Sequence, residues 1–434
     1  MTDLLAARSL MAMSLAFHIV FAIAGMGMPV LMAAAEWRWL RHGDELAREL
    51  AVRWSRGVAI LFAIGAVSGT ILSFELGLLW PEFMRHAGPV IGMPFSLEGF
   101  AFFVEAICIG IYLYGWERTS ARAHWWAGIG VAVSGLLSGA FVVCANAWMN
   151  APAGFDLVDG RFVNVRPLEA MFNPMAGQQV LHMTIAAILA LSGAVAGIHA
   201  WRLMRDPENE LHRLALRIAL PVAAIAAVLQ PLSGDYSAKV VARQQPVKFA
   251  AMEAHFETRA EAPLHLGGWP DVDAQVVRGA IEVPGMLSVL AFGDPSAVVV
   301  GLADVPRALW PPVAVVHIAF QIMVALGLWM ALLYLLAARR LRRGRLERER
   351  PWLLALACSG PAGIVAVQAG WIVTEVGRQP WIIYDIMNVA DAVTPQRGLW
   401  WAFLVAALLY AALSAVVILA LRRHIAAVEG SSHA

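Results

Sequence analysis

A carboxylate and a guanidinium stand at the end of a run of apolar residues long enough to cross a bilayer. The stretch GWIVTEVGRQPW, from Gly370 to Trp381, closes this run with Glu375 and places Arg378 three residues later. Charged groups at such a depth are costly, so they are rare and usually serve an ion, a proton or a cofactor. An ion pair that caps a helix end explains the two residues equally simply, and the rest of the chain must separate these interpretations.

Two histidines, a methionine and a second carboxylate lie in other apolar runs, namely His18, His182, Met323 and Glu98. One histidine and one methionine on facing helices can fill both axial positions of a haem iron, whereas a ligand without an opposing partner leaves the iron open to a gas. Taken singly, a membrane histidine more often joins helices by a hydrogen bond, and a methionine more often packs in the core. The prediction of a haem site therefore rests on the occurrence of these residues together. Zinc would need several His or Cys residues close together, and that spacing is absent.

Two carboxylates share one predicted helix. Glu98 and Glu105 are seven residues apart, so they lie on one face, two turns from each other. Ionisable groups spaced along one face of a membrane helix are more typical of a proton relay than of a structural pair. Glu75 is a further candidate, although it could simply cap its helix.

Composition identifies the class of protein that carries these groups. The 434 residues are 60% hydrophobic and only 15% charged, which predicts an all-α integral membrane protein. Hydropathy gives about nine transmembrane helices, and no basic segment precedes a cleavage site, so the first apolar run is read as a retained helix. The predicted spans are residues 9–35, 57–79, 97–116, 125–149, 177–200, 217–234, 309–337, 352–375 and 398–421.

The arginines of the connecting loops set the orientation. The first, third, fifth and seventh loops are rich in arginine, including the block RRLRRGRLERER from Arg339 to Arg350, and the alternate loops are poorer. Arginine-rich loops stay in the cytoplasm. We therefore expect the N-terminus to face outward. With this orientation, His18, His182, Met323, Glu98 and Glu375 all fall in the outer half of the bilayer.

One connection is much longer than the others and divides the chain into residues 1–234, 235–308 and 309–434. Within the outward segment 235–308, PVKFAAMEAHFETRAEAP is predicted to be a helix limited by Pro246 and Pro263. Phe249, Met252 and Phe256 form an apolar stripe, and Lys248 and Glu253 lie off it. This helix could pack on the membrane domain as a surface element, or it could cover an amphipathic substrate that enters from the lipid.

Other functions are disfavoured by charge and cysteine content. A formal net charge of +1 argues against a nucleic-acid partner. The three cysteines lie within apolar runs, no CxxCH motif indicates covalently attached haem, and no CxxC pair indicates zinc or an iron–sulfur cluster.

At these residues the sequence resembles subunit I of the cytochrome bd family of quinol oxidases, over nearly the whole chain. GWIVTEVGRQPW carries the resemblance most strongly. Further matching segments occur in the family's order: SLAFHIVF, FELGLLW, SLEGFAFFVEA, NAWMNAP, NPMAGQQVLH, KFAAMEAHFET and IMVALG.

The resemblance implies a role for each candidate residue. His182 and Met323 would hold a low-spin haem b, and His18 and Glu375 would each hold one of two high-spin haems, one a haem b and the other a haem d or a third haem b. Glu98 would lie beside the oxygen-reducing haem, and Glu105 on the path of protons from the cytoplasm. The quinol head group would contact Lys248 and Glu253, while Arg378 would pair with haem propionates and Trp371 would pack between cofactors.

The resemblance also implies partners and a location. The chain would be a subunit of a terminal oxidase in the bacterial inner membrane, assembled with a second large membrane subunit (subunit II) and a small single-helix subunit. It would oxidise quinol at the outer face, reduce O2 to water and contribute to the proton motive force without a pump.

Three segments depart from the family pattern. The outward loop is short, Gln321 stands two residues before Met323 where some members have arginine, and Met387-Asn388 replaces a frequent Arg-Thr pair. The short loop is closer to the cyanide-insensitive branch. A proton-coupled secondary transporter and a haem b electron-transfer subunit without oxygen chemistry are the competing interpretations. The first leaves His182, Met323 and GRQPW unexplained, and the second would usually show two histidine pairs.

Overall fold

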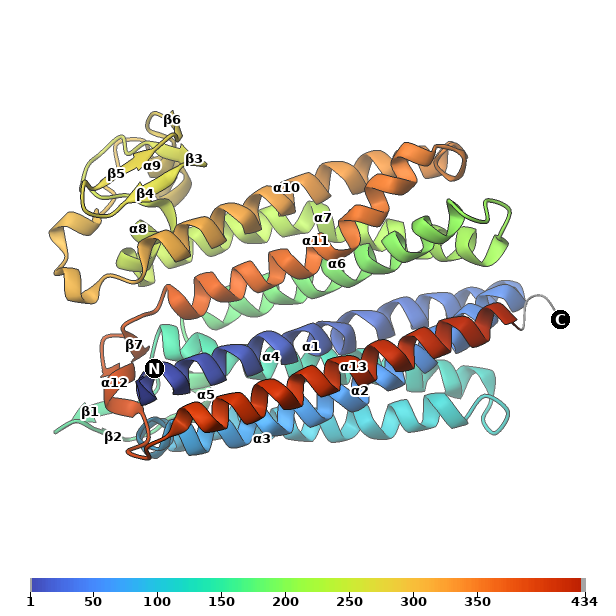
Figure 1. Cartoon of the computed structure of the whole chain (residues 1–434), viewed down its shortest axis with the longest axis horizontal. Helices are drawn as coiled ribbons and strands as arrows, with labels where there is room; N and C mark the ends of the chain where they lie inside the picture. The colour runs from blue at the N-terminus through green and yellow to red at the C-terminus, as the bar shows by residue number, and fades with distance from the viewer. Residues whose placement is uncertain (1, 431–434) are drawn as a thin grey trace.

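Long helices running side by side make up nearly all of the computed structural model, which describes residues 2–430 (Figure 1). Nine helices among these residues are long and apolar enough to cross a membrane, which confirms the predicted number. They are α1 (Asp3–His42), α2 (Glu45–Leu79), α3 (Pro81–Tyr114), α4 (Ala121–Asn150), α6 (Ala176–Leu203), α7 (Glu210–Gln244), α10 (Val313–Arg342), α11 (Arg350–Val376) and α13 (Leu399–Gly430).

Several of these helices extend beyond the predicted spans because prolines do not end them. α3 begins at Pro81 rather than at residue 97, and it contains Pro89 and Pro94. α7 likewise runs without a break through Pro221 and Pro231. Proline at the first helical position lacks only an N–H that would be unpaired anyway. Interior prolines are tolerated in membrane helices, where neighbouring helices and side chains compensate for the freed carbonyl.

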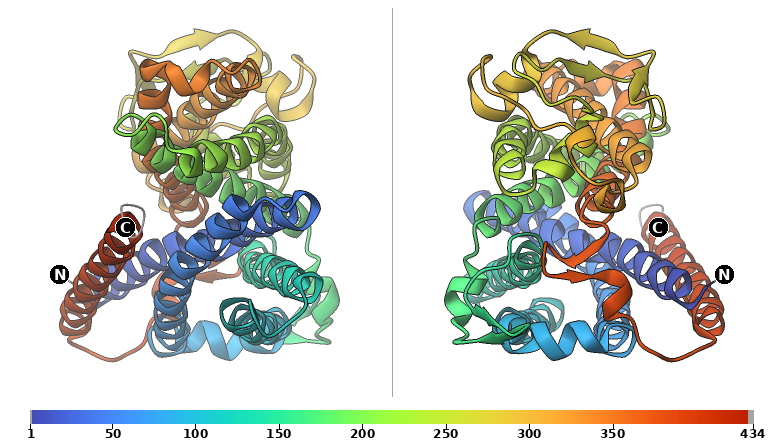
Figure 2. Two further views of the ribbon diagram at one scale, coloured as in Figure 1. Left: turned by 90° about the vertical axis from the view of Figure 1, so that its right-hand side faces the viewer. Right: turned by 90° about the vertical axis from the view of Figure 1, so that its left-hand side faces the viewer.

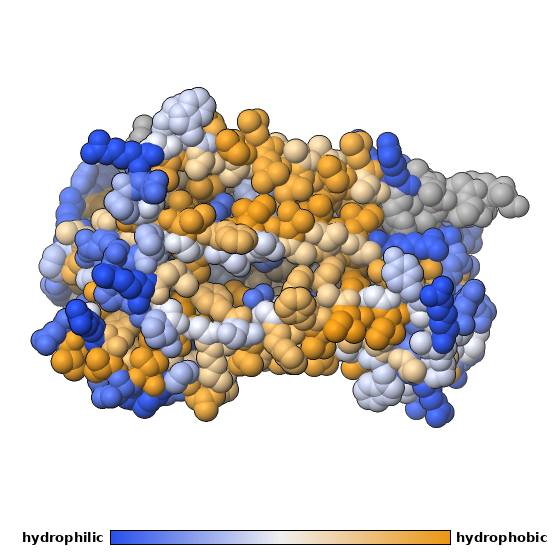
Figure 3. Space-filling view, turned by 90° about the horizontal axis from the view of Figure 1, so that it is seen from below, coloured by the Kyte–Doolittle hydropathy of each residue, from blue (hydrophilic) through white to orange (hydrophobic). Residues whose placement is uncertain are grey.

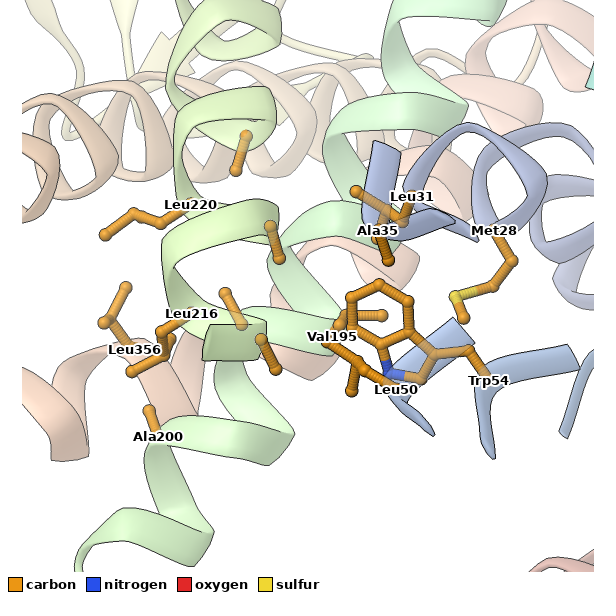
Figure 4. Packing of buried hydrophobic residues seen from close by; sticks show 14 of the residues in the cluster. Met28, Leu31, Ala35, Leu50, Trp54, Val195, Ala200, Leu216, Leu220 and Leu356 are labelled. Carbon is orange, nitrogen blue, oxygen red and sulfur yellow. The ribbon is translucent and has the colours of Figure 1, made fainter. Parts of the chain in front are cut away.

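The nine helices form two groups that meet along α1. The first group contains α1 to α4 with α13 packed against α1 and α2, and the second contains α6, α7, α10 and α11. End-on views show the second group stacked on the first (Figure 2). Side chains from both groups meet in a common core, where residues of α1 and α2 pack against residues of α6, α7 and α11 (Figure 4).

The short elements are concentrated at one end of the bundle, together with the N-terminus (Figure 1). They include helices α5 (Pro167–Met171), α8 (Pro246–Glu253), α9 (Met286–Phe292) and α12 (Val389–Ala392). Four two-stranded antiparallel sheets lie there too: β1 (Asp156–Val158) with β2 (Arg161–Val163), β3 (Leu264–Leu266) with β6 (Ile281–Val283), β4 (Trp269–Asp271) with β5 (Val276–Arg278), and β7 (Trp381–Ile383) with β8 (Met387–Asn388). We call this the loop end and the other the far end. An apolar band separates the polar surfaces of the two ends, as expected of a membrane protein (Figure 3).

The long connection differs from its predicted form in two ways. α7 continues to Gln244, so the first residues of the segment 235–308 are helical. The helix predicted between Pro246 and Pro263 is shorter, because Ala254 has a left-handed backbone (φ 49°) and ends α8 at Glu253. Every residue of α8 from Lys248 to Glu253 is buried. α8 is therefore an internal element rather than a surface helix.

Candidate functional site

Three separate sequence motifs meet at the loop end around Glu375. One carboxylate oxygen of Glu375 accepts a hydrogen bond from the side-chain amide of Asn146 at the end of α4. The other accepts from Nη2 of Arg378 at 2.6 Å. Lys248 of α8 donates from Nζ to Oδ1 of Asn150 at 2.6 Å. NAWMNAP, GWIVTEVGRQPW and KFAAMEAHFET thus contribute to one polar cluster, which we call the Glu375 cluster (Asn146, Asn150, Lys248, Glu375 and Arg378).

A close backbone approach holds Lys248 in this cluster. A β-carbon on Gly377 would lie 3.0 Å from Cε of Lys248, so only glycine leaves room for the lysine chain beside α11. Burial lowers the pKa of Lys248 well below its ordinary value, and the positive charge of Arg378 lowers it further, while Glu375 acts in the opposite sense. The cluster therefore contains two basic side chains and one carboxylate.

Buried donors beside Glu375 fit the propionates of a haem. Nε and Nη1 of Arg378 and Nε1 of Trp371 are buried, and none of them finds an acceptor among the described residues. Buried donors are nearly always satisfied in folded proteins, so these three indicate an anionic group that the chain itself does not supply. A haem carries two carboxylates, and the histidine, thioether and carboxylate groups nearby are of the kinds that ligate its iron.

His18 is oriented for ligation by α2. Its Nδ1 lies 3.0 Å from Oγ of Ser68. The Ser68 hydroxyl already donates to the carbonyls of Ile64 and Gly65, so it must accept from His18, and Nδ1 carries the proton. Nε2 is then the ring nitrogen with a free lone pair, as a metal ligand requires. A β-carbon on Gly69 would lie 2.9 Å from the ring, so this glycine makes room for the histidine.

His182 repeats this arrangement between α6 and α7. Its Nδ1 lies 3.0 Å from Oγ of Ser233, which donates its own proton to the carbonyl of Gln230. Nδ1 is therefore the donor again, and Nε2 is the ring nitrogen that carries the lone pair. The side-chain amide of Gln230 lies 3.1 Å from this nitrogen.

Met323 approaches from the other side of the same helix group. It lies against Gly370, where a β-carbon would be 3.0 Å from its sulfur. α6 and α10 both pack on α7 and on α11. His182 of α6 and Met323 of α10 therefore belong to opposite helices of one four-helix group, and their role as axial ligands stays a prediction.

Glu98 and Glu105 both face α4 from α3. The Glu98 carboxyl interacts with the hydroxyl of Ser138. Glu105 is 5% exposed and fits between two glycines, since a β-carbon on Gly25 or Gly135 would lie 3.4 or 3.1 Å from its Oε1. Because α3 begins at Pro81, Glu98 lies near the middle of the helix rather than at its start.

The structure separates the two residues expected to contact a quinol. Lys248 and Glu253 are five positions apart on α8, so they point to different sides of it. Lys248 joins the Glu375 cluster, whereas Glu253 is buried and its Oε2 has no partner among the described residues. Burial raises the pKa of Glu253 to about 8. A carboxyl in this condition can exchange a proton near neutral pH.

Gln321 has a specific contact at the position where some relatives carry arginine. Its side chain accepts from the backbone N–H of Gly267 at 3.2 Å and donates to the carbonyl of His265 at 3.0 Å. One turn earlier on α10, His317 bonds to the carbonyl of Met252 at 2.8 Å. The Gln321 contacts attach the loop to α10, and the His317 contact attaches α8 to α10. The sequence did not indicate this role of His317 in positioning α8.

Sequence reasoning missed the residues that orient the ligands. Ser68 and Ser233 are ordinary serines in apolar helices, and nothing in the sequence pairs them with histidines about fifty residues away. Asn146 and Asn150 did carry a signal, because they are four residues apart in NAWMNAP and so share a helix face.

Comparison with known proteins gives a consistent result. A family model described as cytochrome bd terminal oxidase subunit I matches residues 6–429. A Bacillus subtilis protein named as a cytochrome bd menaquinol oxidase subunit I is 35% identical, over 96% of this chain and 95% of its own length. The cytochrome bd-II ubiquinol oxidase subunit 1 of Escherichia coli is 28% identical over 88% of each chain. A structure of bd oxidase from Geobacillus thermodenitrificans aligns with a TM-score of 0.92 and 38% identity, covering 97% of this chain and 99% of that one.

Proposed function

The chain belongs to the cytochrome bd terminal oxidase subunit I family, and we propose that it oxidises a membrane quinol beside α8 and reduces O2 within the bundle, drawing protons from the far end. Membership identifies a quinol:oxygen oxidoreductase of the respiratory chain and a multi-pass bacterial membrane protein. The balanced reaction takes two quinols and one O2 to two quinones and two waters.

The observation that carries the proposal is the excess of buried donors around Glu375. Arg378 and Trp371 hold three donor atoms that have no acceptor within residues 2–430, and Lys248 adds a buried amine. Haem propionates would accept from Arg378 and Trp371. We assign His182 and Met323 to a low-spin haem b, and His18 and Glu375 to two high-spin haems, of which one is a haem b and the other a haem d or a further haem b. When bound, these groups would supply one-electron transfer, and a haem without a second protein ligand would supply a position for O2.

Side chains of this protein orient the two histidines and transfer the protons of the reaction. Ser68 and Ser233 hold the histidines with Nε2 free. Glu253 accepts a quinol proton at its unpartnered oxygen, and Lys248 supplies a positive group on the other side of α8. Glu105 and Glu98 pass protons toward the site of water formation along one face of α3.

The sidedness of these proton movements follows from the arginine-rich loops. Quinol protons leave at the loop end, which we assign to the outside, and the protons for water enter from the cytoplasmic far end. Charge then separates across the membrane without a pump. We further propose that subunit II, and a small single-helix subunit, complete the complex. The quinol is left open, because the relatives' names include both menaquinol and ubiquinol.

The test is quinol-dependent O2 uptake by the purified complex, with a reduced-minus-oxidised spectrum of the same sample. We expect two quinols consumed per O2, and bands from both low-spin and high-spin haem. A folded sample without haem bands would favour a transporter. Low-spin bands alone, with no O2 uptake, would favour an electron-transfer subunit.

A further inference from the structure

Three ionisable residues form a buried cluster at the far end, and the mechanism above does not use them. Glu36 of α1, Tyr112 of α3 and His124 of α4 are 0%, 0% and 1% exposed. Nδ1 of His124 lies 2.7 Å from Oε1 of Glu36, and its Nε2 lies 2.8 Å from the backbone carbonyl of Tyr112. We call these three residues the Glu36 cluster.

Hydrogen-bond accounting shows that this cluster holds one exchangeable proton. A carbonyl can only accept, so Nε2 of His124 must carry a hydrogen. The short contact between Nδ1 and Oε1 then needs one more proton, on either the imidazole or the carboxyl. Without it, two lone pairs would face each other in a water-free site. The contact between His124 and Glu36 therefore holds one proton between the imidazole and the carboxyl.

The second carboxylate oxygen of Glu36, Oε2, lies on the side toward Tyr112. Oε2 of Glu36 and the hydroxyl of Tyr112 are both buried and lie close enough to interact with each other, and among the described residues neither has another partner. Both lie beside Gly128, whose β-carbon would come 3.6 Å from Oε2 and 2.7 Å from the Tyr112 ring.

The cluster continues the line of carboxylates already described. Glu98, Glu105 and Tyr112 follow one another at seven-residue intervals, so they share a face of α3. On α1, Gly25 contacts Glu105 and Glu36 contacts His124, eleven residues further on and on the same face. The remaining distance from Tyr112 to Glu105 is two helical turns, about 10 Å.

A single aromatic ring separates the cluster from the far-end surface. The Trp116 ring lies 4.0 Å from the His124 ring, and the guanidinium of Arg48 sits over Trp116. Trp116 belongs to the short connection between α3 and α4, whose residues from Glu117 to Ser120 are exposed. The partly buried Trp116 ring thus lies between His124 and these exposed residues.

We propose that the Glu36 cluster is the loading station at which protons bound for Glu105 enter the bundle. A proton from water binds the Glu36–His124 pair, moves from Oε1 to Oε2 as the carboxyl rotates, and passes through the Tyr112 hydroxyl toward Glu105. The pair returns to its starting state when the next proton arrives. This inference rests on the proposed function, since it names the inlet of the same proton path.

The Glu36→Gln variant of the whole complex tests the proposal. Glutamine keeps the shape and can donate to Nδ1 of His124, but it cannot take up and release a proton. We expect O2 uptake with excess quinol to fall about tenfold or more and its solvent deuterium isotope effect to rise. Haem content and anaerobic reduction by quinol should stay at wild-type levels. Tyr112→Phe, which removes one hydroxyl, should reduce turnover in the same way but less.

His199→Gln is the matched control. His199 is also a buried histidine near the far end, where it bonds to Trp54 and His212 outside the carboxylate line. Both histidine substitutions, His124→Gln and His199→Gln, should lower thermal stability, but only His124→Gln should raise the isotope effect.

Turnover within about twofold of wild type and an unchanged isotope effect in Glu36→Gln would overturn the loading station. If Glu36→Gln does not assemble, the same result in Tyr112→Phe overturns it. A wild-type complex that lacks haem or O2 uptake would instead refute the proposed function, so the two failures are distinct.

Discussion

The two ends of the bundle both bury charged side chains, but they balance them differently. At the loop end, Lys248 and Arg378 surround the one carboxylate of Glu375, and donor atoms are left without acceptors. At the far end, Glu36 and His124 satisfy each other through one shared proton. A surplus of buried donors indicates an anionic partner from outside the chain, whereas a balanced pair beside an unsatisfied oxygen suits proton exchange.

The largest expected effect comes from replacing Arg378, which supplies two of the three buried donor atoms that have no acceptor among the described residues. Arg378→Leu removes a buried guanidinium from its ion pair with the partly exposed Glu375, which should destabilise the complex by about 2 kcal/mol. It should also reduce haem content, because the propionate donors are lost. Thermal unfolding and haem per protein measure the two effects. Arg85→Leu is the control, since the exposed Arg85–Glu82 pair should contribute less than about 1 kcal/mol. Wild-type haem content in Arg378→Leu would contradict the assignment.

Met323→Leu tests ligation with little change in packing. The swap nearly conserves volume, so it should cost less than about 1.5 kcal/mol. The low-spin band should nevertheless disappear from the reduced-minus-oxidised spectrum, because leucine cannot ligate iron.

Met330→Leu is the matched control for that substitution. Met330 is buried on the same helix, two turns further along, and has no assigned ligand role. Its spectrum should equal that of the wild type. Two identical variant spectra would remove Met323 from the ligand set.

Glu105→Gln tests whether Glu105 carries protons from the far end of the bundle toward the site of water formation. Turnover with excess quinol should fall about tenfold or more, while every haem band is retained, because the residue carries protons rather than a cofactor. Glu82→Gln, an exposed carboxylate at the start of the same helix, should have no effect. Stopped-flow proton uptake and O2 consumption are the measurements, and full activity in Glu105→Gln would exclude this residue from the path.

The smallest effect concerns the pH dependence of Glu253. Its pKa in the folded protein is about 8 against an ordinary value near 4.5. The folded state therefore binds more protons between these values, and stability is lost as pH rises from about 4.5 to 8. Quinol oxidation should show the opposite trend and rise as pH passes about 8, because only the ionised carboxyl accepts a proton.

Glu253→Gln should remove both pH trends. Unfolding temperature and the kcat/KM for quinol, each measured from pH 5 to 9, report them separately. A wild-type profile that lacks a step near pH 8 would mean that another group receives the quinol proton.

Features of the fold and of the site could be predicted from the sequence where the residues that form them lie close together in the chain. The nine membrane-spanning helices were predictable because hydropathy is local, and Glu375 with Arg378 stood out because one short motif contains both. Helix length was underestimated at α3, which begins at Pro81 and runs through Pro89 and Pro94 before the predicted start at residue 97.

Partners distant in sequence could not be predicted. Glu36 and His124 are 88 residues apart, and each alone resembles an interfacial residue at a helix end. The length of α8 was also beyond sequence reasoning, because the left-handed backbone at Ala254 has no signature in an alanine.

The central claim is that His18, His182, Met323 and Glu375 hold haem iron within this bundle. Pyridine-haem extraction from the purified complex tests it most directly, because it gives the type and the amount of haem together. The account predicts three haems per complex, at least two of them haem b. A correctly folded, colourless complex that yields no haem would contradict it.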